Sequence, residues 1–364
     1  MSQLDASVVD SVELAGTPYE RGRTHGEAFA DEVRSNVEVY FDRFDYHGAD
    51  EATVREQAEE FVPLIEEGNE TYFEEMTGVV DGSGVPIEEV AALNARWEVM
   101  YSALADEAAA VDGCTGFGVQ PEVTADGRAY MGQNWDWIPE IETFVMDVRR
   151  ESKPDMVVMT EAGIVGGKIG VNQHGIGMAV NGLISAGDGA DPYRKPMHVR
   201  FREAMDAERL DTAIRPLIAG DRAVSANVIL GHAAGEFIDL ELSPTAVNHL
   251  YPEDGILTHA NHFVDDRVES EFELLVPDTL CRAPRMRRLL ERRADEIDVD
   301  VITGVLRDHF GRPASICRHA DEDLPERERV HTNGSYVVDL EDRRLLATRG
   351  PPCKGEYQAF DVAS

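Results

Sequence analysis

Residues with chemically reactive or polar side chains cluster around Cys114 in this sequence. Cys114 follows Asp112 and Gly113, at the point where a helical pattern gives way to an alternating one. A cysteine thiolate is a strong nucleophile that forms thioesters with acyl groups. Gly113 can adopt backbone conformations closed to other residues, which a strained and attackable peptide bond before Cys114 would need. A lone cysteine is more often a small buried apolar residue, so its neighbours decide how it is interpreted.

A second polar segment, GQNWDW at residues 132–137, is expected to lie beside Cys114. Segments 114–121 and 128–135 are typical of two strands joined by a turn that contains Asp126-Gly127, a hairpin signal. An antiparallel hairpin returns Asp136 to the start of the first strand. The spacing therefore predicts a carboxylate next to a cysteine nucleophile.

The elements that must position these residues are a helical first third and a mixed remainder. Apolar side chains at three- and four-residue spacing predict helices over 18–44, over 52–76 and from 86 into 104–110. Later helices are expected over 197–208, 211–219, 278–295 and 299–309. Strands are expected over 143–150, 156–161, 168–185 with a turn at 172–175, 224–231, 236–242, 245–251, 256–260, 332–339 and 343–348. Many antiparallel strands with helices grouped between them favour a layered α+β fold over a doubly wound sheet.

The start of the first helix carries small residues at regular spacing. Gly16, Tyr19, Gly22 and Gly26 form the pattern G-x-x-Y-x-x-G-x-x-x-G. We interpret it as close packing of one helix against another.

The net charge of the chain limits the classes of function that it can have. The 364 residues include 70 Asp plus Glu against 34 Lys plus Arg, a net charge of −36. A field of this sign repels phosphate backbones and anionic lipids, which argues against nucleic-acid and membrane partners. Only four of the basic residues are lysine, and such an acidic surface suits molar salt, where screening removes the self-repulsion. With no signal-peptide pattern and no apolar run of about 18 residues, we expect a soluble, cytoplasmic, halophilic protein.

The cysteines and histidines give no compact metal motif. The four cysteines (Cys114, Cys281, Cys317, Cys353) form neither a disulfide framework nor a C-x-x-C pair. The richest histidine patch is His249, His259 and His262 with Asp265 and Asp266, and its gaps fit no compact zinc motif. Histidines at strand ends beside a polar loop are the simpler interpretation. No metal or organic cofactor is therefore expected.

The two motifs together resemble those of a known family. DGCTGFG followed by GQNWDW is similar to the acyl-coenzyme A:6-aminopenicillanic-acid acyltransferase (isopenicillin N acyltransferase) family of N-terminal-nucleophile (Ntn) enzymes. The resemblance covers nearly the whole chain: the glycine-spaced first helix, LNARWEVMY at 93–101, THANHF at 258–263, SICRH at 315–319 and RGPPC at 349–353. It implies a four-layer αββα Ntn-hydrolase sandwich with a helical N-terminal segment.

The resemblance also implies that the protein cleaves itself between Gly113 and Cys114. Residues 1–113 would become a helical chain and residues 114–364 the catalytic portion, together one composite domain and a heterodimer of the two fragments. The freed α-amine of Cys114, with a pKa of about 7.7–8.0, could then serve as general base near neutral pH. The thiol would take an acyl group from a small-molecule amide or acyl-coenzyme A. Water or an amine resembling 6-aminopenicillanic acid would resolve the thioester.

Three further site residues follow from the resemblance, position by position. Asp136 would position the Cys114 amine or thiol, and Asn261 would donate its side-chain amide to the oxyanion. Arg318 would be the buried cation that holds Asp136 or a substrate carboxylate. One position departs from the family pattern: Gly116 stands where a hydroxyl residue is common. Thr115 points to the opposite strand face, so that hydrogen bond is missing or supplied elsewhere.

Two alternatives stay open at the level of sequence. A thiol hydrolase could use His262 as the base for Cys114 and would leave the Gly113–Cys114 bond intact. A binding protein could keep the fold without processing or catalysis, and Gly116 gives this alternative some support.

Overall fold

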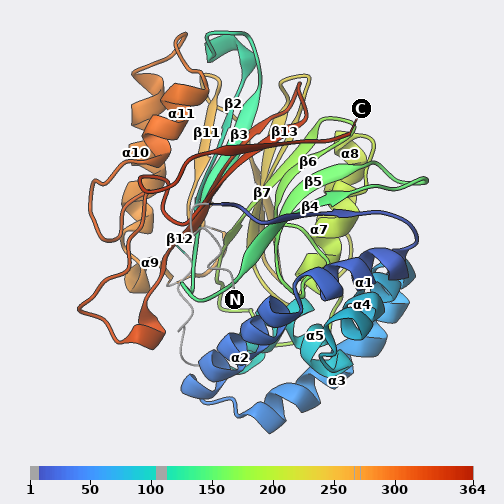
Figure 1. Ribbon diagram of the computed structural model, residues 1–364. Coiled ribbons are helices and arrows are strands. Elements are labelled where there is room, and N and C mark those ends of the chain that lie inside the picture. The colour runs from blue at the N-terminus through green and yellow to red at the C-terminus, as the bar shows by residue number, and fades with distance from the viewer. Residues whose placement is uncertain (1–7, 104–112, 266, 271, 364) are drawn as a thin grey trace.

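Two β-sheets pack face to face at the centre of the molecule, with helices on both outer faces (Figure 1). The computed structural model describes residues 8–103, 113–265, 267–270 and 272–363. α7 (Met197–Met205) and α8 (Leu210–Ile218) cover one sheet, and α10 (Thr279–Glu291) and α11 (Val299–Leu306) cover the other. The predicted four-layer α+β fold is confirmed. Within the described residues, every helix is too short or too polar to span a bilayer.

The first sheet has eight strands and is antiparallel except at one edge. Its order is β1 (Ser11–Leu14), β4 (Thr143–Val148), β5 (Met156–Glu161), β6 (Ile169–Asn172), β7 (Ile176–Gly182), β8 (Ala226–His232), β9 (Phe237–Leu242) and β10 (Val247–Leu250). β1 runs parallel to β4. It was not predicted, because a four-residue edge strand carries too little pattern to stand out.

The second sheet has six antiparallel strands, with the predicted hairpin inside it. Its order is β11 (Ile256–His259), β2 (Thr115–Val119), β3 (Tyr130–Trp137), β12 (His331–Asp339), β13 (Arg344–Arg349) and β14 (Gln358–Asp361). In the hairpin, Thr115 pairs with Asn134 and Val119 with Tyr130. The start of β2 therefore lies beside the end of β3, as the sequence predicts.

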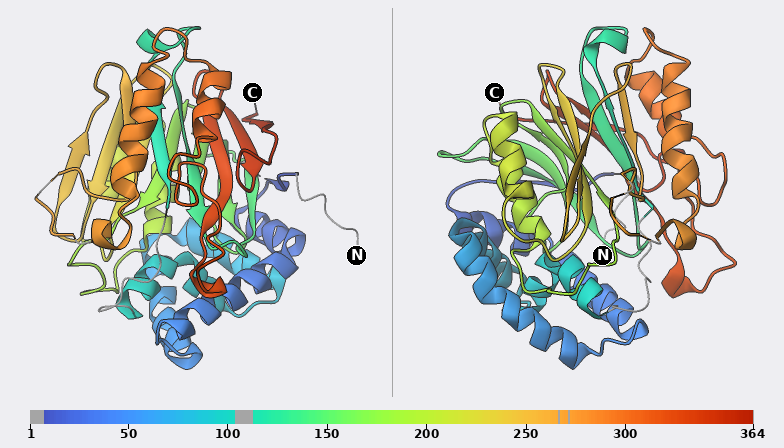
Figure 2. Two further views of the ribbon diagram at one scale, coloured as in Figure 1. Left: turned by 90° about the vertical axis from the view of Figure 1, so that its left-hand side faces the viewer. Right: turned by 180° about the vertical axis from the view of Figure 1, so that it is seen from behind.

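The N-terminal helices gather at one end of the two sheets (Figure 2). They are α1 (Pro18–Ala28), α2 (Ala30–Tyr46), α3 (Glu51–Gly68), α4 (Glu70–Ser83), α5 (Ile87–Asn94) and α6 (Arg96–Ala103), while a short α9 (Phe272–Leu275) precedes α10. The two long helices predicted over 18–44 and 52–76 are each two helices, broken at Phe29 and Asn69. At the second break the Asn69 side chain accepts from the Tyr72 N–H, which caps a new helix.

The helix expected from residue 86 onward is also divided. It consists of α5 and α6, which are separated at Ala95. The part of this prediction that covers 104–110 lies outside the described residues.

Glycines bring α1 and α4 into backbone contact, as the predicted close packing requires. A Cβ atom at Gly22 would lie 1.7 Å from the Glu75 carbonyl oxygen, and one at Gly26 would lie 2.5 Å from that of Val79. On α4, a Cβ atom at Gly78 would lie 2.2 Å from the Tyr19 carbonyl oxygen. No larger residue fits at these points unless the helices separate.

Alternate residues of β2 point to opposite sides of the second sheet. Phe117 and Val119 point outward into an apolar cluster with Met286 and Ile302 of α10 and α11. The inward positions are glycines: a Cβ atom at Gly118 would lie 2.8 Å from the Phe237 ring of the other sheet. This alternation follows from the two-residue period of a strand. It lets the sheets approach closely next to Cys114.

Candidate active site

The polar side chains of GQNWDW fix the end of β3 from both sides. Gln133 points inward and exchanges two hydrogen bonds with the Val180 backbone of the opposite sheet, at 2.8 and 2.6 Å. Asn134 points outward and donates to the carbonyl oxygens of Leu306 and Ile316, at 2.8 and 2.7 Å. Backbone groups on both neighbouring layers are thereby tied to one strand, and the next outward residue, Asp136, has a fixed position.

Cys114 and Asp136 lie side by side and are fully buried. The Asp136 N–H points at Cys114 Sγ, at 3.4 Å, and the Asp136 carbonyl oxygen lies 3.8 Å from the same sulfur. A backbone N–H aimed at sulfur stabilises a thiolate, because it interacts more strongly with the charged form. The structure thus places Asp136 where the hairpin predicts it, while its role in catalysis stays a prediction.

The Asp136 carboxylate is held by a cation and a hydroxyl. Its Oδ2 atom accepts from Arg318 Nε at 3.2 Å, and its Oδ1 atom accepts from Thr332 Oγ1 at 2.6 Å. Arg318 forms a second ion pair through Nη2 with Asp278. The structure therefore pairs Arg318 with Asp136, one of the two partners that the resemblance implies for it.

Gly113 lies against this ion pair with no room for a side chain. A Cβ atom at Gly113 would be 2.4 Å from Arg318 Nε and 3.0 Å from Asp136 Oδ2. The physical requirement for glycine at this position is therefore space. Both residues of the Gly113–Cys114 bond are buried.

Arg282 of α10 is a site residue that the sequence analysis missed. Its Nη1 atom donates to the Gly113 carbonyl oxygen at 2.6 Å and to Thr115 Oγ1 at 2.9 Å, and it also contacts the Cys114 carbonyl oxygen. Its Nη2 atom donates to Asn261 Oδ1 at 2.8 Å. The only local signal is the (i, i+4) spacing of Asp278 and Arg282, which is common on exposed helix surfaces.

Two arginines and two aspartates make a compact, formally neutral cluster next to the Gly113–Cys114 bond. Arg282 Nε lies 2.7 Å from Asp278 Oδ2, so Asp278 is shared between Arg282 and Arg318. Burial raises the pKa of Asp278, but the two guanidinium groups outweigh burial and hold its pKa below the usual range. Burial lowers the pKa of Arg282, and Asp278 offsets part of that change. Arginine stays protonated in proteins, so a positive group faces the Gly113 carbonyl.

Asn261 is connected to this carbonyl through Arg282. Its Oδ1 atom accepts from Arg282, while its Nδ2 atom donates to the Gly182 carbonyl oxygen at 2.9 Å. Its own N–H donates to Thr279 Oγ1 at 2.7 Å. The structure therefore brings Asn261 into the site, and its predicted role as oxyanion donor stays a prediction.

The histidines near Asn261 are occupied by separate contacts. The His262 ring lies 2.9 Å from Thr279 Oγ1, and burial, with His259 and Arg282 nearby, lowers its pKa to about 4. His259 forms a buried ion pair with Glu241 at 2.9 Å. Burial alone would lower the pKa of His259, but Asp239 and Glu241 raise it to about 9. Asp266 of the patch lies outside the described residues.

The space above Gly116 is filled from the opposite sheet. A Cβ atom at Gly116 would lie 2.9 Å from Ile229 Cδ1 and 3.1 Å from Asn181 Nδ2. Asn181 Nδ2 donates to Asn227 Oδ1 at 2.7 Å, and among the described residues its Oδ1 atom is buried without a hydrogen-bond partner. A polar amide from another strand therefore lies at the position where the resemblance predicts a hydroxyl group.

A cavity of about 650 Å³ opens beside the ion-paired cluster. Asp278 and Arg318 form part of its wall, and the rest comes from the end of α2, residues 275–276 and the loop before β12. The lining combines apolar side chains (Leu275, Val276, Leu324, Val330) with polar and charged ones (Arg43, Tyr46, His47, Glu328). A mixed lining of this kind suits a small molecule with an apolar and a polar part.

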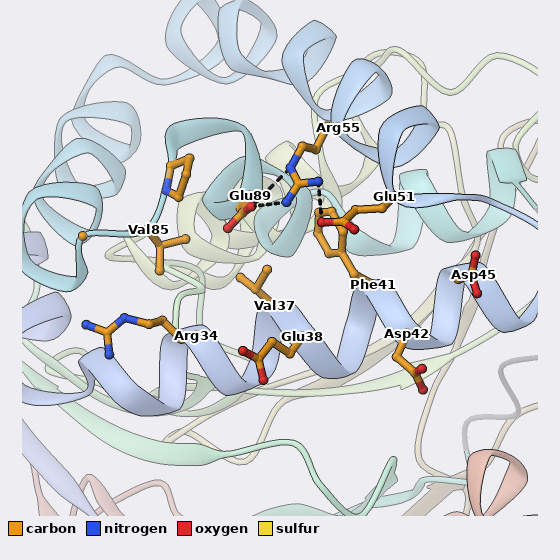
Figure 3. A pocket seen from close by; sticks show the side chains of 12 residues that line it. Arg34, Val37, Glu38, Phe41, Asp42, Asp45, Glu51, Arg55, Val85 and Glu89 are labelled. Carbon is orange, nitrogen blue, oxygen red and sulfur yellow. Dashed lines mark hydrogen bonds and ion pairs between the residues drawn. The ribbon is translucent and has the colours of Figure 1, made fainter.

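A second cavity, of about 680 Å³, shares no lining residue with the first and lies among α2, α3 and α5 (Figure 3). Arg55 lies in it between Glu51 and Glu89, at 2.5 and 2.6 Å. Glu38, Asp42 and Asp45 add further acidic groups to its lining. It is an acidic groove in the helical layer, separate from the candidate site.

Comparisons with known proteins place the chain in a family. The acyl-coenzyme A:6-aminopenicillanic acid acyl-transferase model matches residues 123–348, a segment that begins after Cys114. The acyl-coenzyme A:6-aminopenicillanic-acid-acyltransferase 40 kDa form of Emericella nidulans is 28% identical over 349 residues, 94% of this chain and 92% of that protein. An uncharacterized protein of Archaeoglobus fulgidus is 25% identical, over 79% of this chain and 55% of its own length.

Solved structures with a similar arrangement are more distant. Penicillin V acylase from Agrobacterium tumefaciens aligns with a TM-score of 0.48 and 13% identity, over 68% of this chain and 86% of its own. A mutant of conjugated bile acid hydrolase from Clostridium perfringens aligns with a TM-score of 0.47 and 12% identity, over 68% and 92%. The family match spans more than half of the sequence. The chain therefore belongs to the acyl-coenzyme A:6-aminopenicillanic acid acyl-transferase family.

Proposed function

We propose that this protein cleaves its own Gly113–Cys114 bond and then acts as an acyltransferase or amide hydrolase through a Cys114 thioester. One observation carries the proposal: Arg282 Nη1 lies 2.6 Å from the Gly113 carbonyl oxygen while the Asp136 N–H points at Cys114 Sγ. Both the electrophile and the nucleophile of the self-cleavage reaction are thus contacted by groups that stabilise negative charge.

Self-cleavage takes two steps. Cys114 Sγ attacks the Gly113 carbonyl carbon, the C–N bond breaks, and the thiol proton passes to the departing nitrogen. The negative charge that develops on the Gly113 oxygen faces the Arg282 guanidinium. Water then hydrolyses the thioester, which frees the thiol and leaves a carboxyl group on Gly113 and an α-amine on Cys114. The products are residues 1–113 and 114–364, which stay together as a heterodimer.

Turnover of external substrates uses the same groups. The Cys114 α-amine, with a pKa of about 7.7–8.0, takes the thiol proton and later gives it to the leaving group. Asp136, held by Arg318 and Thr332, orients this amine. Asn261 lies one hydrogen bond from Arg282 and supplies an amide N–H to the oxyanion once Gly113 has left. No cofactor is needed for these steps.

The substrate is a small amide or acyl thioester. The Emericella nidulans relative is named for acyl-coenzyme A and 6-aminopenicillanic acid. The cavity of about 650 Å³ is large enough for an acyl chain, and it adjoins Arg318. Arg43 in its wall offers a cation for a substrate carboxylate. The acceptor is water or an amine of the 6-aminopenicillanic-acid type.

The test is intact-mass analysis of the full chain expressed and purified in molar KCl. We expect two fragments, the second beginning Cys-Thr-Gly, and a single uncut chain for Cys114→Ala. Cys281→Ala is the matched control, because Cys281 is an exposed cysteine of α10 whose thiol should not take part in cleavage. Processed protein is then assayed for release of free coenzyme A and amine from acyl-coenzyme A and amides. A folded wild-type chain that stays uncut would contradict the proposal and would favour the His262-assisted thiol hydrolase or a binding role.

A further inference from the structure

Four potential metal ligands meet in the loop region that precedes β12. His309, Cys317, His319 and Cys353, here called the Cys2His2 cluster, each offer one ligand atom, and the four atoms all lie within 4.8 Å of one another. His319 Nε2 is 3.1 Å from His309 Nε2, 3.7 Å from Cys317 Sγ and 3.5 Å from Cys353 Sγ.

The three separations from His319 Nε2 match edges of a tetrahedral zinc site, and the other pairs of ligand atoms lie within 4.8 Å. With Zn–S bonds of about 2.3 Å and Zn–N bonds of about 2.0–2.1 Å, a tetrahedron has edges of about 3.4 Å between nitrogens and about 3.6 Å between nitrogen and sulfur. The observed values of 3.1, 3.7 and 3.5 Å lie within about 0.3 Å of these edges. Two thiolates and two imidazoles are a donor set typical of structural zinc.

Backbone hydrogen bonds hold the segments that carry the cluster. The Cys317 N–H donates to the Asp308 carbonyl oxygen, and the His319 N–H to that of Pro313, both at 3.0 Å. The segment that carries Cys353 is fastened to the end of α11, because Arg307 Nε donates to the Pro352 carbonyl oxygen at 2.9 Å. Three of the ligands lie within residues 309–319 and the fourth, Cys353, lies after β13, so no compact sequence motif contains all four.

We propose that the Cys2His2 cluster binds one zinc ion as a closed, four-coordinate structural site. Binding releases the two thiol protons, and each neutral imidazole donates its Nε2 lone pair to the ion. The site fastens the segment after β13 to the loop before β12. It also flanks the candidate active site, because Cys317 and His319 are the immediate neighbours of Arg318, which pairs with Asp136 and Asp278.

A disulfide between Cys317 and Cys353 is the competing use of the same residues. It would consume both sulfur ligands and leave only the two histidines. The two states differ in metal content and in the number of free thiols, which makes them separable by experiment.

The experiment measures metal in the full-length protein after removal of any affinity tag and of loosely bound metal by gel filtration. Atomic spectrometry should find one zinc per chain in the wild type and in Cys281→Ser, but far less in Cys353→Ser and in His309→Ala. Reduced, metal-free wild type should bind Co²⁺ and show the thiolate charge-transfer bands and the intense visible bands of a tetrahedral site. The thiolate bands should be weaker in Cys353→Ser.

The same measurement in Cys114→Ala separates this site from the proposed activity, because zinc should remain at one per chain in a protein that cannot cleave itself. Zinc content equal in wild type and Cys353→Ser would overturn the proposal. So would a wild type isolated with a Cys317–Cys353 disulfide that, once reduced, gives no thiolate–Co²⁺ bands.

Discussion

Replacing Arg282 by glutamine should slow self-cleavage by about a hundredfold. The substitution removes the Nη1 donor that lies 2.6 Å from the Gly113 carbonyl oxygen. Loss of one such donor costs about 10²–10³ in rate in enzymes with an oxyanion hole. We expect the lower end of that range, because Arg282 already contacts the carbonyl before attack, and only the part of the interaction that strengthens in the transition state accelerates the step.

The assay follows the fraction of cut chain against time after freshly synthesised protein is folded in molar KCl. Arg285→Gln is the matched control: Arg285 lies on the same helix but pairs with Asp308, at 2.7 Å. Its cleavage rate should stay within about twofold of the wild type, because its side-chain hydrogen bonds go to Asp308 and not to the Gly113 carbonyl oxygen. Arg282→Lys keeps the charge but loses the fork of donors, so its rate should lie between those of the glutamine variant and the wild type.

A folding defect must be separated from a chemical one, because Arg282 is buried and shared by Asp278 and Asn261. Thermal unfolding of Arg282→Gln in the Cys114→Ala background reports stability without cleavage. If the variant is folded and cuts as fast as the wild type, Arg282 does not stabilise the oxyanion. The 2.6 Å contact would then serve the fold alone.

Three further outcomes are expected. Gly22→Ala should destabilise the fold by about 1–3 kcal/mol in urea unfolding because it forces α1 from α4, whereas Gly304→Ala, a helical site with open space around it, should stabilise by a few tenths to about 1 kcal/mol. The pKa of His259 in the folded state is about 9, above its ordinary value of 6.5. Protonated His259 therefore stabilises the fold fully below pH 6.5, and this stabilisation is lost as the pH rises towards 9. The stability difference between wild type and His259→Gln should therefore shrink between pH 6 and 9.5, and a constant difference would contradict the assignment. With a net charge of −36, the melting temperature should rise from about 0.1 M to about 2 M KCl, and a salt-independent value would argue against adaptation to a salty interior.

The sequence determined the parts of this protein that depend on local pattern. Two alternating segments around Asp126-Gly127 predict the hairpin, and its register alone places Asp136 beside Cys114. The glycine spacing of the first helix predicts a close helix contact, which α1 and α4 make. Periodicity and turn signals extend over a few residues, so they can be read without the rest of the chain.

Only the tertiary structure brings distant groups together at the Gly113–Cys114 bond. Arg282 looks like one of several arginines in a basic helix, and only the packing of α10 against β11 and β2 aims it at the Gly113 carbonyl. The same holds for the Cys2His2 cluster, whose ligands come from a loop and a later segment. The helix break at Asn69 is different, because it has a local signal: the Asn69 side chain caps α4 by accepting from the Tyr72 N–H. Contacts between remote segments leave no periodic trace in the sequence, because each side is selected against a partner far away in the chain.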